Sequence, residues 1–454
     1  MNSIQKNKEL KLFAITWPIF VETLLRMLLG NLDTIMLSNY SENAVASVGA
    51  SNQINMVIVI LFSIIATGTT IVISQYLGAG MKEKADSAAI SALVMNLAAG
   101  LFLSFVMFTF ARSILKVMNI PEELLADSVL YLKMVGSCAF LNAMIATCSS
   151  ILRSHGSTRP AMLVVLVMNI INALGNWFFL YSPVGNPVLG VRGVALATIL
   201  SQVIALIALL IIIARMGLKF SLKAVFQPDR EVVRNVLKIG LPSAGENLVY
   251  HLSSLVITYI ITFMGTEALT TRVMTFNLMY FIMIPGMSLG QGTQILVGHR
   301  VGAGRNQEAY KLCLRSLLYG VIGSILASFV IYLFRHSLLG IFSENPNIIA
   351  TGGKLLALAI LLEPGRVFNL VLMNSLKASG DVRFPVFMGC ISPWIFAVGL
   401  SWLLGIHFGF GLIGVWIGYS ADEWFRGWTA FFRWKSRAWE QKALLRKTVD
   451  EPQI

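Results

Sequence analysis

Twelve long apolar runs, separated by short polar segments, dominate the chain. Their approximate bounds are 12–38, 52–77, 87–110, 126–152, 160–181, 191–216, 234–263, 274–299, 309–334, 349–377, 385–405 and 412–434. A helix needs about 20 apolar residues to cross the hydrocarbon core of a bilayer, and each run reaches about that length. Because backbone groups within lipid must be hydrogen-bonded inside the segment, each run is predicted to be a helix. The pattern predicts an all-α polytopic membrane protein with twelve transmembrane helices.

Composition supports this fold class. Of the 454 residues, 56% are hydrophobic and only 13% are charged, whereas soluble domains carry about 25% charged residues. The net charge of +13 could indicate a nucleic-acid partner, but the basic residues fall between the apolar runs, which is typical of membrane topology. We therefore expect the bilayer, and no nucleic acid, as the surroundings of this chain.

Lysine and arginine are concentrated in the two tails and in every second connection, for example at Lys82 and Lys84 and at Arg153 and Arg159. The remaining connections carry few basic residues. Positively charged connections stay in the cytoplasm. We expect a multi-pass protein of the inner (plasma) membrane with both termini cytoplasmic and, because the polar start runs straight into a full-length span, no cleaved signal peptide.

The first half of the chain is repeated in the second half at an offset of 224 residues, which we call the repeat offset. Near the end of each half the offset drops to 221, where Gly190 meets Gly411. Matched positions include Pro18 with Pro242, Glu22 with Glu246, Gly68-Thr69 with Gly292-Thr293, and Gly78-Ala79-Gly80 with Gly302-Ala303-Gly304. Six spans per half is an even number, so both halves enter the membrane in the same sense, as parallel repeats around a binding cavity do. The predicted domains are an N-lobe (1–216), a cytoplasmic linker (217–233), a C-lobe (234–434) and a cytoplasmic tail (435–454).

One acid breaks the repeat, because Asp33 falls on Ile257 in the second half. An ionisable group inside a transmembrane helix is expensive unless it is paired, hydrated or neutral, and is therefore a functional candidate. Protonation of a carboxyl group in a low-dielectric cavity depends on its surroundings and can be coupled to conformation. The alternative is a solvated acid at a helix end.

Three polar residues of the fifth and sixth spans are candidate partners of this acid. Asn172 and Asn176 are one helical turn apart and share a face, and Thr198 lies in the next span. Amide and hydroxyl oxygens with one carboxylate suit a small hard cation, and they also suit a hydrogen-bonded protonated acid. The same asparagines could equally serve as hydrogen bonds between helices.

Other charges within the spans occur as pairs at helical spacing. Glu22 and Arg26 are expected to form a structural pair. Glu363 with Arg366 and Glu423 with Arg426 have the same kind of spacing, which brings each pair onto one helix face.

Glu246 has no partner at this spacing, although His251 lies about one turn further along. The sequence is compatible with two hypotheses for the C-lobe charges Glu246, Glu363, Arg366, Glu423 and Arg426. In the first, they form structural pairs or an inner gate; in the second, they handle substrate or protons.

Signs of enzyme chemistry are missing from the sequence. It contains no Ser/His/Asp set, metal cluster or nucleotide motif, and the Gly78-Ala79-Gly80 turn lacks the Lys-Ser/Thr of a phosphate loop. The four cysteines are scattered (Cys138, Cys148, Cys313 and Cys390) and show no redox or metal spacing. We expect neither enzymatic activity nor a cofactor other than a coupling ion.

Taken together, these motifs resemble the MATE (multidrug and toxic compound extrusion) family along essentially the whole chain. The motifs are Trp17-Pro18 with Asp33-Thr34, the two Gly-Thr and two Gly-Ala-Gly sites, Gly240-Leu241-Pro242, and Leu376-Lys377-Ala378-Ser379-Gly380-Asp381. The resemblance implies two six-helix lobes in a V, export of organic cations by alternating access, and an N-lobe site of Asp33, Asn172, Asn176 and Thr198.

The chain departs from the family pattern in two places. Many members carry a second acid where this chain has Asn176, which favours H⁺ over Na⁺ as the coupling ion. Some members have a cation site in the C-lobe; the best counterparts here are Glu246 and Glu363, but they are shifted, and Arg366 stands where an acid is expected.

Three functions are compatible with a membrane protein of this kind. The first is a monomeric exporter of small lipophilic cations, coupled to inward H⁺ (less favoured, Na⁺) through Asp33. The second is a flippase for lipid-linked oligosaccharide or another lipid precursor, which should need a cationic cavity; Arg26, Arg366 and Arg426 each have a nearby acid, which argues against it. The third, a membrane scaffold or enzyme, is disfavoured by the repeat and by the intramembrane acid.

Overall fold

The computed structural model describes residues 10–181, 188–218 and 229–443, and within these ranges the chain is helical, without β-strands. The α-helices are α1 (Leu12–Ser38), α2 (Glu42–Gly78), α3 (Lys82–Val117), α4 (Glu122–Ser137), α5 (Ala139–Ser154), α6 (Thr158–Tyr181), α7 (Gly190–Arg215), α9 (Arg230–Thr262), α10 (Thr266–Gly302), α11 (Asn306–Leu333), α12 (Arg335–Gly340), α13 (Pro346–Ala378), α14 (Arg383–Ser392) and α15 (Leu412–Lys435). Two π-helical turns, η1 (Pro393–Val398) and η2 (Ser401–His407), continue α14, and a short 3₁₀ helix, η3 (Ala438–Lys442), follows α15.

The twelve predicted spans correspond to helices of this structure. Among the described residues, nine helices are long and apolar enough to cross a membrane, with the run from α14 through η2 counted as one. The pair α4 and α5 passes the same test together, bent by 44°. The more highly charged helices α9 and α15 account for the other two spans. The all-α polytopic fold is therefore confirmed.

Several helices extend beyond the predicted spans. Helix α2 begins at Glu42 rather than near residue 52, and α10 begins at Thr266 rather than near residue 274. Apolar periodicity marks only the part of a helix that faces lipid or core, whereas hydrogen bonding continues into polar residues at its ends. Pro18, Pro242 and Pro285 all lie inside helices.

The chain divides into two compact units, each of which is described by itself. Unit 1 contains residues 1–20, 74–80 and 242–454, and unit 2 contains residues 21–73 and 81–241. The chain therefore passes from one unit into the other inside α1, after Phe20, and inside α9, after Leu241, as well as at both ends of the segment Ser74–Gly80. The lobe bounds inferred from the repeat remain a prediction, and residues 219–228 of the linker and 444–454 of the tail lie outside the described residues.

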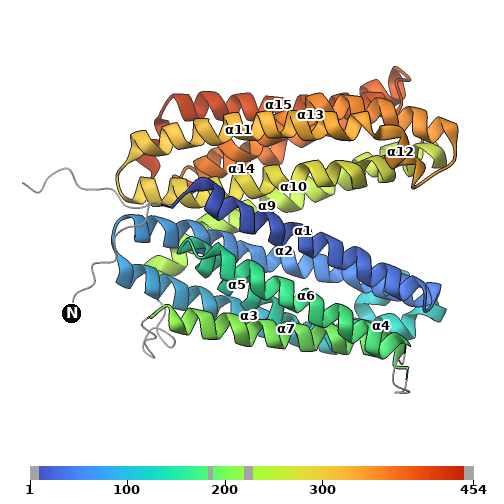
Figure 1. The fold of residues 1–454 in the computed structure, drawn as a ribbon, viewed down its shortest axis with the longest axis horizontal. Coiled ribbons are helices and arrows are strands. Elements are labelled where there is room, and N and C mark those ends of the chain that lie inside the picture. The colour runs from blue at the N-terminus through green and yellow to red at the C-terminus, as the bar shows by residue number, and fades with distance from the viewer. Residues whose placement is uncertain (1–9, 182–187, 219–228, 444–454) are drawn as a thin grey trace, which may run out of the picture. The chain divides into compact units, whose positions relative to one another are not determined.

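In unit 1, helix α13 lies at the centre and packs against α10, α11 and α15 (Figure 1). Its buried face joins two apolar clusters, one around Trp434 and Trp439 and the other around Trp416. In unit 2, α3 packs on α4 and α5, and α7 packs on α4, α5 and α6. Buried apolar residues of unit 2 form two clusters, one that contains Val135 and Val194 and one that contains Phe62 and Leu132.

The repeated Gly-Ala-Gly segments serve a helix crossing in unit 1. A Cβ at Gly78 would collide with the backbone carbonyl of His299, and a Cβ at Gly302 would collide with that of Gln75. Gly78 matches Gly302 and Gln75 matches His299 at the repeat offset, so the last turns of α2 and α10 pack through equivalent glycines. Gly80 and Gly304 follow with φ of +76° and +72°, in the left-handed region that glycine adopts without strain.

Candidate functional site

The four residues predicted around Asp33 come together in unit 2. The Nδ2 of Asn176 donates a hydrogen bond to Asp33 Oδ1 over 2.7 Å and lies 3.4 Å from Asn172 Oδ1. The Nδ2 of Asn172 in turn donates to Thr198 Oγ1 over 3.2 Å. Helices α1, α6 and α7 thus contribute to one chain of polar contacts that ends on the acid. The structure confirms that these residues are neighbours, while their role in coupling remains a prediction.

A polar face of α6 makes this arrangement possible. Asn169, Asn172 and Asn176 recur at helical spacing and are all buried. The first of them, Asn169, donates from Nδ2 to the backbone carbonyl of Leu25 over 2.9 Å, which ties α6 to α1 two turns before Asp33. These amides join α1 to α6 as well as surround the acid, so interhelical bonding and an ion site are compatible readings.

Tyr131 of α4 was not predicted to belong to this site. It is buried, its hydroxyl interacts with Thr198, and it lies within electrostatic reach of Asp33. A tyrosine in an apolar run gives no sequence signal that separates a site residue from ordinary packing, since tyrosine packs widely in membrane helices.

The arrangement suits a proton or a small cation on the acid. Asp33 meets a neutral amide rather than a fixed cation, so its charge can change without leaving an opposite charge unpaired. Asn176 Oδ1 is buried and accepts no hydrogen bond from the described residues. The described part of the chain contains no group of three or more His, Cys, Asp or Glu side chains that could hold a metal ion.

Glu22 forms the predicted pair with Arg26 and a second pair that was not predicted. The Arg26 Nη2–Glu22 Oε1 distance is 3.2 Å, and Nη1 of Arg153, at the end of α5, lies 3.2 Å from both carboxylate oxygens. The carboxylate is almost completely buried, and the Arg153 side chain is 20% exposed. Arg153 therefore joins α1 to α5.

Glu246, which has no predicted partner on its own helix, pairs with a base from another helix. Its Oε2 lies 2.6 Å from Nζ of Lys377, at the end of α13, and Cys390 of α14 lies within electrostatic reach of both charges. Helical spacing identifies partners only on the same helix, where His251 is the nearest candidate. The cation instead comes from another helix that lies far away along the chain.

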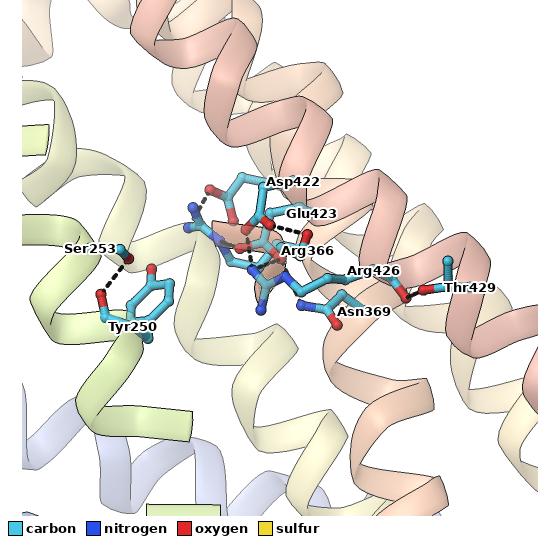
Figure 2. A network of polar contacts seen from close by, with 10 residues as sticks. Tyr250, Ser253, Arg366, Asn369, Asp422, Glu423, Arg426 and Thr429 are labelled. Carbon is cyan, nitrogen blue, oxygen red and sulfur yellow. Dashed lines mark hydrogen bonds and ion pairs between the residues drawn. The ribbon is translucent and has the colours of Figure 1, made fainter. Parts of the chain in front are cut away.

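Apart from Glu246, the candidate charged residues of the C-lobe form one buried network between α13 and α15 (Figure 2). Arg366 binds Glu363 over 2.8 Å and Glu423 over 3.2 Å, and Arg426 binds Glu423 over 3.2 Å. Both predicted pairs, Glu363–Arg366 and Glu423–Arg426, are therefore present and share members. Among the contacts of the described residues, none joins this network to Glu246.

Neutral and acidic residues that were not among the predicted members complete this network. Arg426 makes its shortest ion pair, of 2.6 Å, with Asp422. Ser392 Oγ donates to Asp422 over 2.5 Å, and Asn369 Nδ2 donates to Glu423 over 2.8 Å. Tyr250 of α9 lies beside the network (Figure 2) and interacts electrostatically with Arg366 and Glu423. Each guanidinium is paired with two acids, and the Arg366–Glu423 pair joins α13 to α15.

Comparison with known proteins gives the family. The MatE family model matches residues 18–178 and again residues 242–403. The two matches start at Pro18 and at Pro242, which are equivalent positions of the two halves, and this confirms the internal repeat.

Two relatives are similar over nearly their whole length. The uncharacterised transporter YisQ of Bacillus subtilis is 46% identical over 439 residues, which are 96% of each chain. The probable multidrug resistance protein NorM of Thermotoga maritima is 27% identical over 444 residues, covering 97% of this chain and 95% of that protein.

Solved structures share the fold. An outward-facing multidrug resistance MATE family transporter of the MOP superfamily has a TM-score of 0.87 at 21% identity, covering 96% of this chain and all of the other. A MOP superfamily transporter of Pyrococcus furiosus, described as having a binding pocket of reversed polarity, has a TM-score of 0.86 at 20% identity, covering 95% and 98%. Since the family model covers most of both halves of the chain, this protein belongs to the MATE (MatE) family of multi-span membrane transporters.

Proposed function

We propose that this protein exports lipophilic organic cations across the plasma membrane by alternating access, driven by H⁺ that enters through Asp33. The observation that carries the proposal is the partly buried chain from Asp33 through Asn176 and Asn172 to Thr198. Relatives named as probable multidrug resistance proteins support export as the direction and drugs as the cargo.

The geometry around Asp33 favours H⁺ over Na⁺. A hard cation prefers several oxygen ligands with negative charge among them, and here Asp33 supplies one carboxylate while the other oxygens belong to neutral amides and a hydroxyl. The Asn176 amide presents its NH₂ group to that carboxylate. A proton needs only the acid itself and neutral neighbours that tolerate both of its charge states.

Coupling then follows from competition. The ionised acid attracts an organic cation from the inner side, and a proton from the outer side neutralises the acid and releases the cation. Exclusion of one ligand by the other couples the two movements. In this scheme the transporter works as a monomer with both termini in the cytoplasm, and it needs no cofactor besides its coupling ion.

Efflux from proteoliposomes tests the proposal. A fluorescent lipophilic cation is loaded, and a proton gradient or a Na⁺ gradient is imposed separately on the wild type and on Asp33→Asn. Asp127→Asn is a matched control, because Asp127 is an exposed acid of α4. We expect export under the proton gradient by the wild type and the control, and no coupled export by Asp33→Asn despite normal folding.

Two outcomes contradict this scheme. Export driven by Na⁺ that survives in Asp33→Asn moves the coupling site to the C-lobe acids, with Glu246 the first to test. The absence of cation movement under either gradient favours the lipid-precursor flippase. The structure does not support that flippase, because Arg26, Arg366 and Arg426 are each paired with an acid and offer little positive charge to a pyrophosphate.

A further inference from the structure

Two ion pairs occupy equivalent places in the two repeats. Glu22 pairs with Arg153 in unit 2, and Glu246 pairs with Lys377 in unit 1. The two acids are separated by the repeat offset, and so are the two bases. The repeat has therefore kept a whole interaction between helices, even though the base has changed from arginine to lysine.

The acid of each pair follows, within five residues, a point where the chain passes from one unit into the other. Pro18 and Pro242 each lie one helical turn before their acid, and the passages fall after Phe20 and after Leu241. A proline inside a helix removes one backbone hydrogen bond. An ion pair one turn later attaches the part of the helix that follows the proline to a neighbouring helix of the same unit. Such a contact fixes the rotation of this part about the helix axis and its position along that axis.

The pair of the first repeat controls the face that carries Asp33. Asp33 follows Glu22 by about three turns at roughly 3.6 residues per turn, so both lie on the same face of α1. The corresponding residue after Glu246 is Ile257, which is completely buried in the apolar cluster around Trp416. The two helices are thus held in the same way, but only α1 presents an acid.

We propose that Glu22 and Arg153 are positioning residues that hold α1 at the rotation and height at which Asp33 meets Asn176. The equivalent pair, Glu246 with Lys377, places an apolar residue and has no influence on the proton. This inference rests on the proposed role of Asp33 in coupling. Loss of the first pair should change the proton dependence of export, and loss of the second should not.

The charged and titratable groups around these positions define the controls. Among the described residues, Glu22 faces Arg26 of its own helix and Arg153 of α5, while Asp33 faces Tyr131 of α4 and the neutral Asn176. Arg26 touches Glu22 but belongs to α1 and cannot attach α1 to another helix. Replacing it changes the same local charge without removing the attachment.

The first test measures drug export in proteoliposomes as a function of external pH. The midpoint is the external proton concentration at which export is half-maximal. In Glu22→Gln and Arg153→Gln we expect this midpoint to change by about threefold or more, because a misplaced Asp33 loses a charge-assisted hydrogen bond. Arg153→Lys should keep the wild-type midpoint, since lysine serves at the equivalent position. Arg26→Gln and Glu246→Gln should also keep it, whatever they do to the maximal rate. Equal midpoint shifts in Glu22→Gln and Glu246→Gln would overturn the proposal.

The second test follows the position of α1 without transport. Asp33→Cys and Asn176→Cys are combined in a background in which the four native cysteines are replaced, and the rate of disulfide formation is measured. Adding Glu22→Gln should change this rate severalfold, and adding Arg26→Gln should leave it unchanged. An unchanged rate with Glu22→Gln refutes the positioning role. A changed rate in a protein whose export ignores pH supports positioning and contradicts only the proposed coupling.

Discussion

Glu423 is the acid that joins both arginines of the buried C-lobe network, and neutralising it tests how that network is built. Its carboxylate accepts from Arg366 over 3.2 Å, Arg426 over 3.2 Å and Asn369 over 2.8 Å. Glu363 has one such contact, with Arg366 over 2.8 Å. The same change, Glu to Gln, is therefore made at a centre with three donors and at an edge with one.

The expected magnitudes follow from these partners. Breaking a buried ion pair typically costs about 3–5 kcal/mol, because the remaining charge is left uncompensated. After Glu423→Gln, Arg366 keeps Glu363 and Arg426 keeps Asp422, so we expect a loss at the low end of that range, about 3 kcal/mol. After Glu363→Gln, Arg366 keeps Glu423, and we expect about 1.5 kcal/mol, the lower end of the range for one hydrogen bond to a charged group.

Equilibrium unfolding in mixed micelles with increasing SDS, followed by tryptophan fluorescence, measures both free energies of unfolding. Equal losses, or a larger loss for Glu363→Gln, would refute the assignment of Glu423 as the centre. Wild-type stability of Glu423→Gln together with lost export would show that the network handles substrate or protons rather than locking α13 to α15.

Two further predictions concern the helix ends. Gly302→Ala should lower stability by about 2 kcal/mol or more, because its Cβ meets the backbone of Gln75 and overpacking forces backbone shifts; Gly323→Ala, at a site with no atom within 4 Å of the new Cβ, should stay within about 0.5 kcal/mol of the wild type in the same unfolding assay. Burial lowers the pKa of His155, which follows α5, below its usual 6.5. The unfolded chain then binds this proton more readily, so stability should fall as pH drops below about 6.5, and His155→Gln should reduce that fall in thermal unfolding between pH 7.5 and 5.5; an unchanged pH dependence would contradict it.

The fold was largely predictable because its two strongest determinants are visible along the chain. Length and apolarity define the spans, and the offset shared by the matching motifs reveals the repeat. The break between α4 and α5 at Cys138, and the π-helical turns η1 and η2, were not predicted. They depend on how neighbouring helices pack, which local hydrophobicity does not encode.

Partners on the same helix were predicted correctly and partners on other helices were mostly missed. The spacing of Glu363 and Arg366 fixes their distance, whereas nothing local brings Arg153 to Glu22 or Lys377 to Glu246. A signal was nevertheless present, because both bases lie at the repeat offset, as both acids do. Pairs of charges that recur together in both halves are candidates for contact, and that comparison would have found both ion pairs.

The places where the repeats differ support coupling in the first half. At the positions that match the network acids Glu363 and Glu423, the first half has Ala139 and, in the register that aligns Gly190 with Gly411, Gln202. At the position that matches Asp33 the second half has Ile257. Each half therefore has its own polar centre, but the two differ in kind.

The two polar centres differ in how much it costs to protonate their acids. Protonating Glu423 would take a counter-charge from two buried guanidinium groups, which is expensive in a low-dielectric interior. Among the described residues, the hydrogen-bond partner of Asp33 is a neutral amide, so protonating Asp33 breaks no ion pair of these residues. The proposed coupling site has to gain and lose a proton in every transport cycle, which the second arrangement permits at lower cost, and in this chain that arrangement lies in the first repeat.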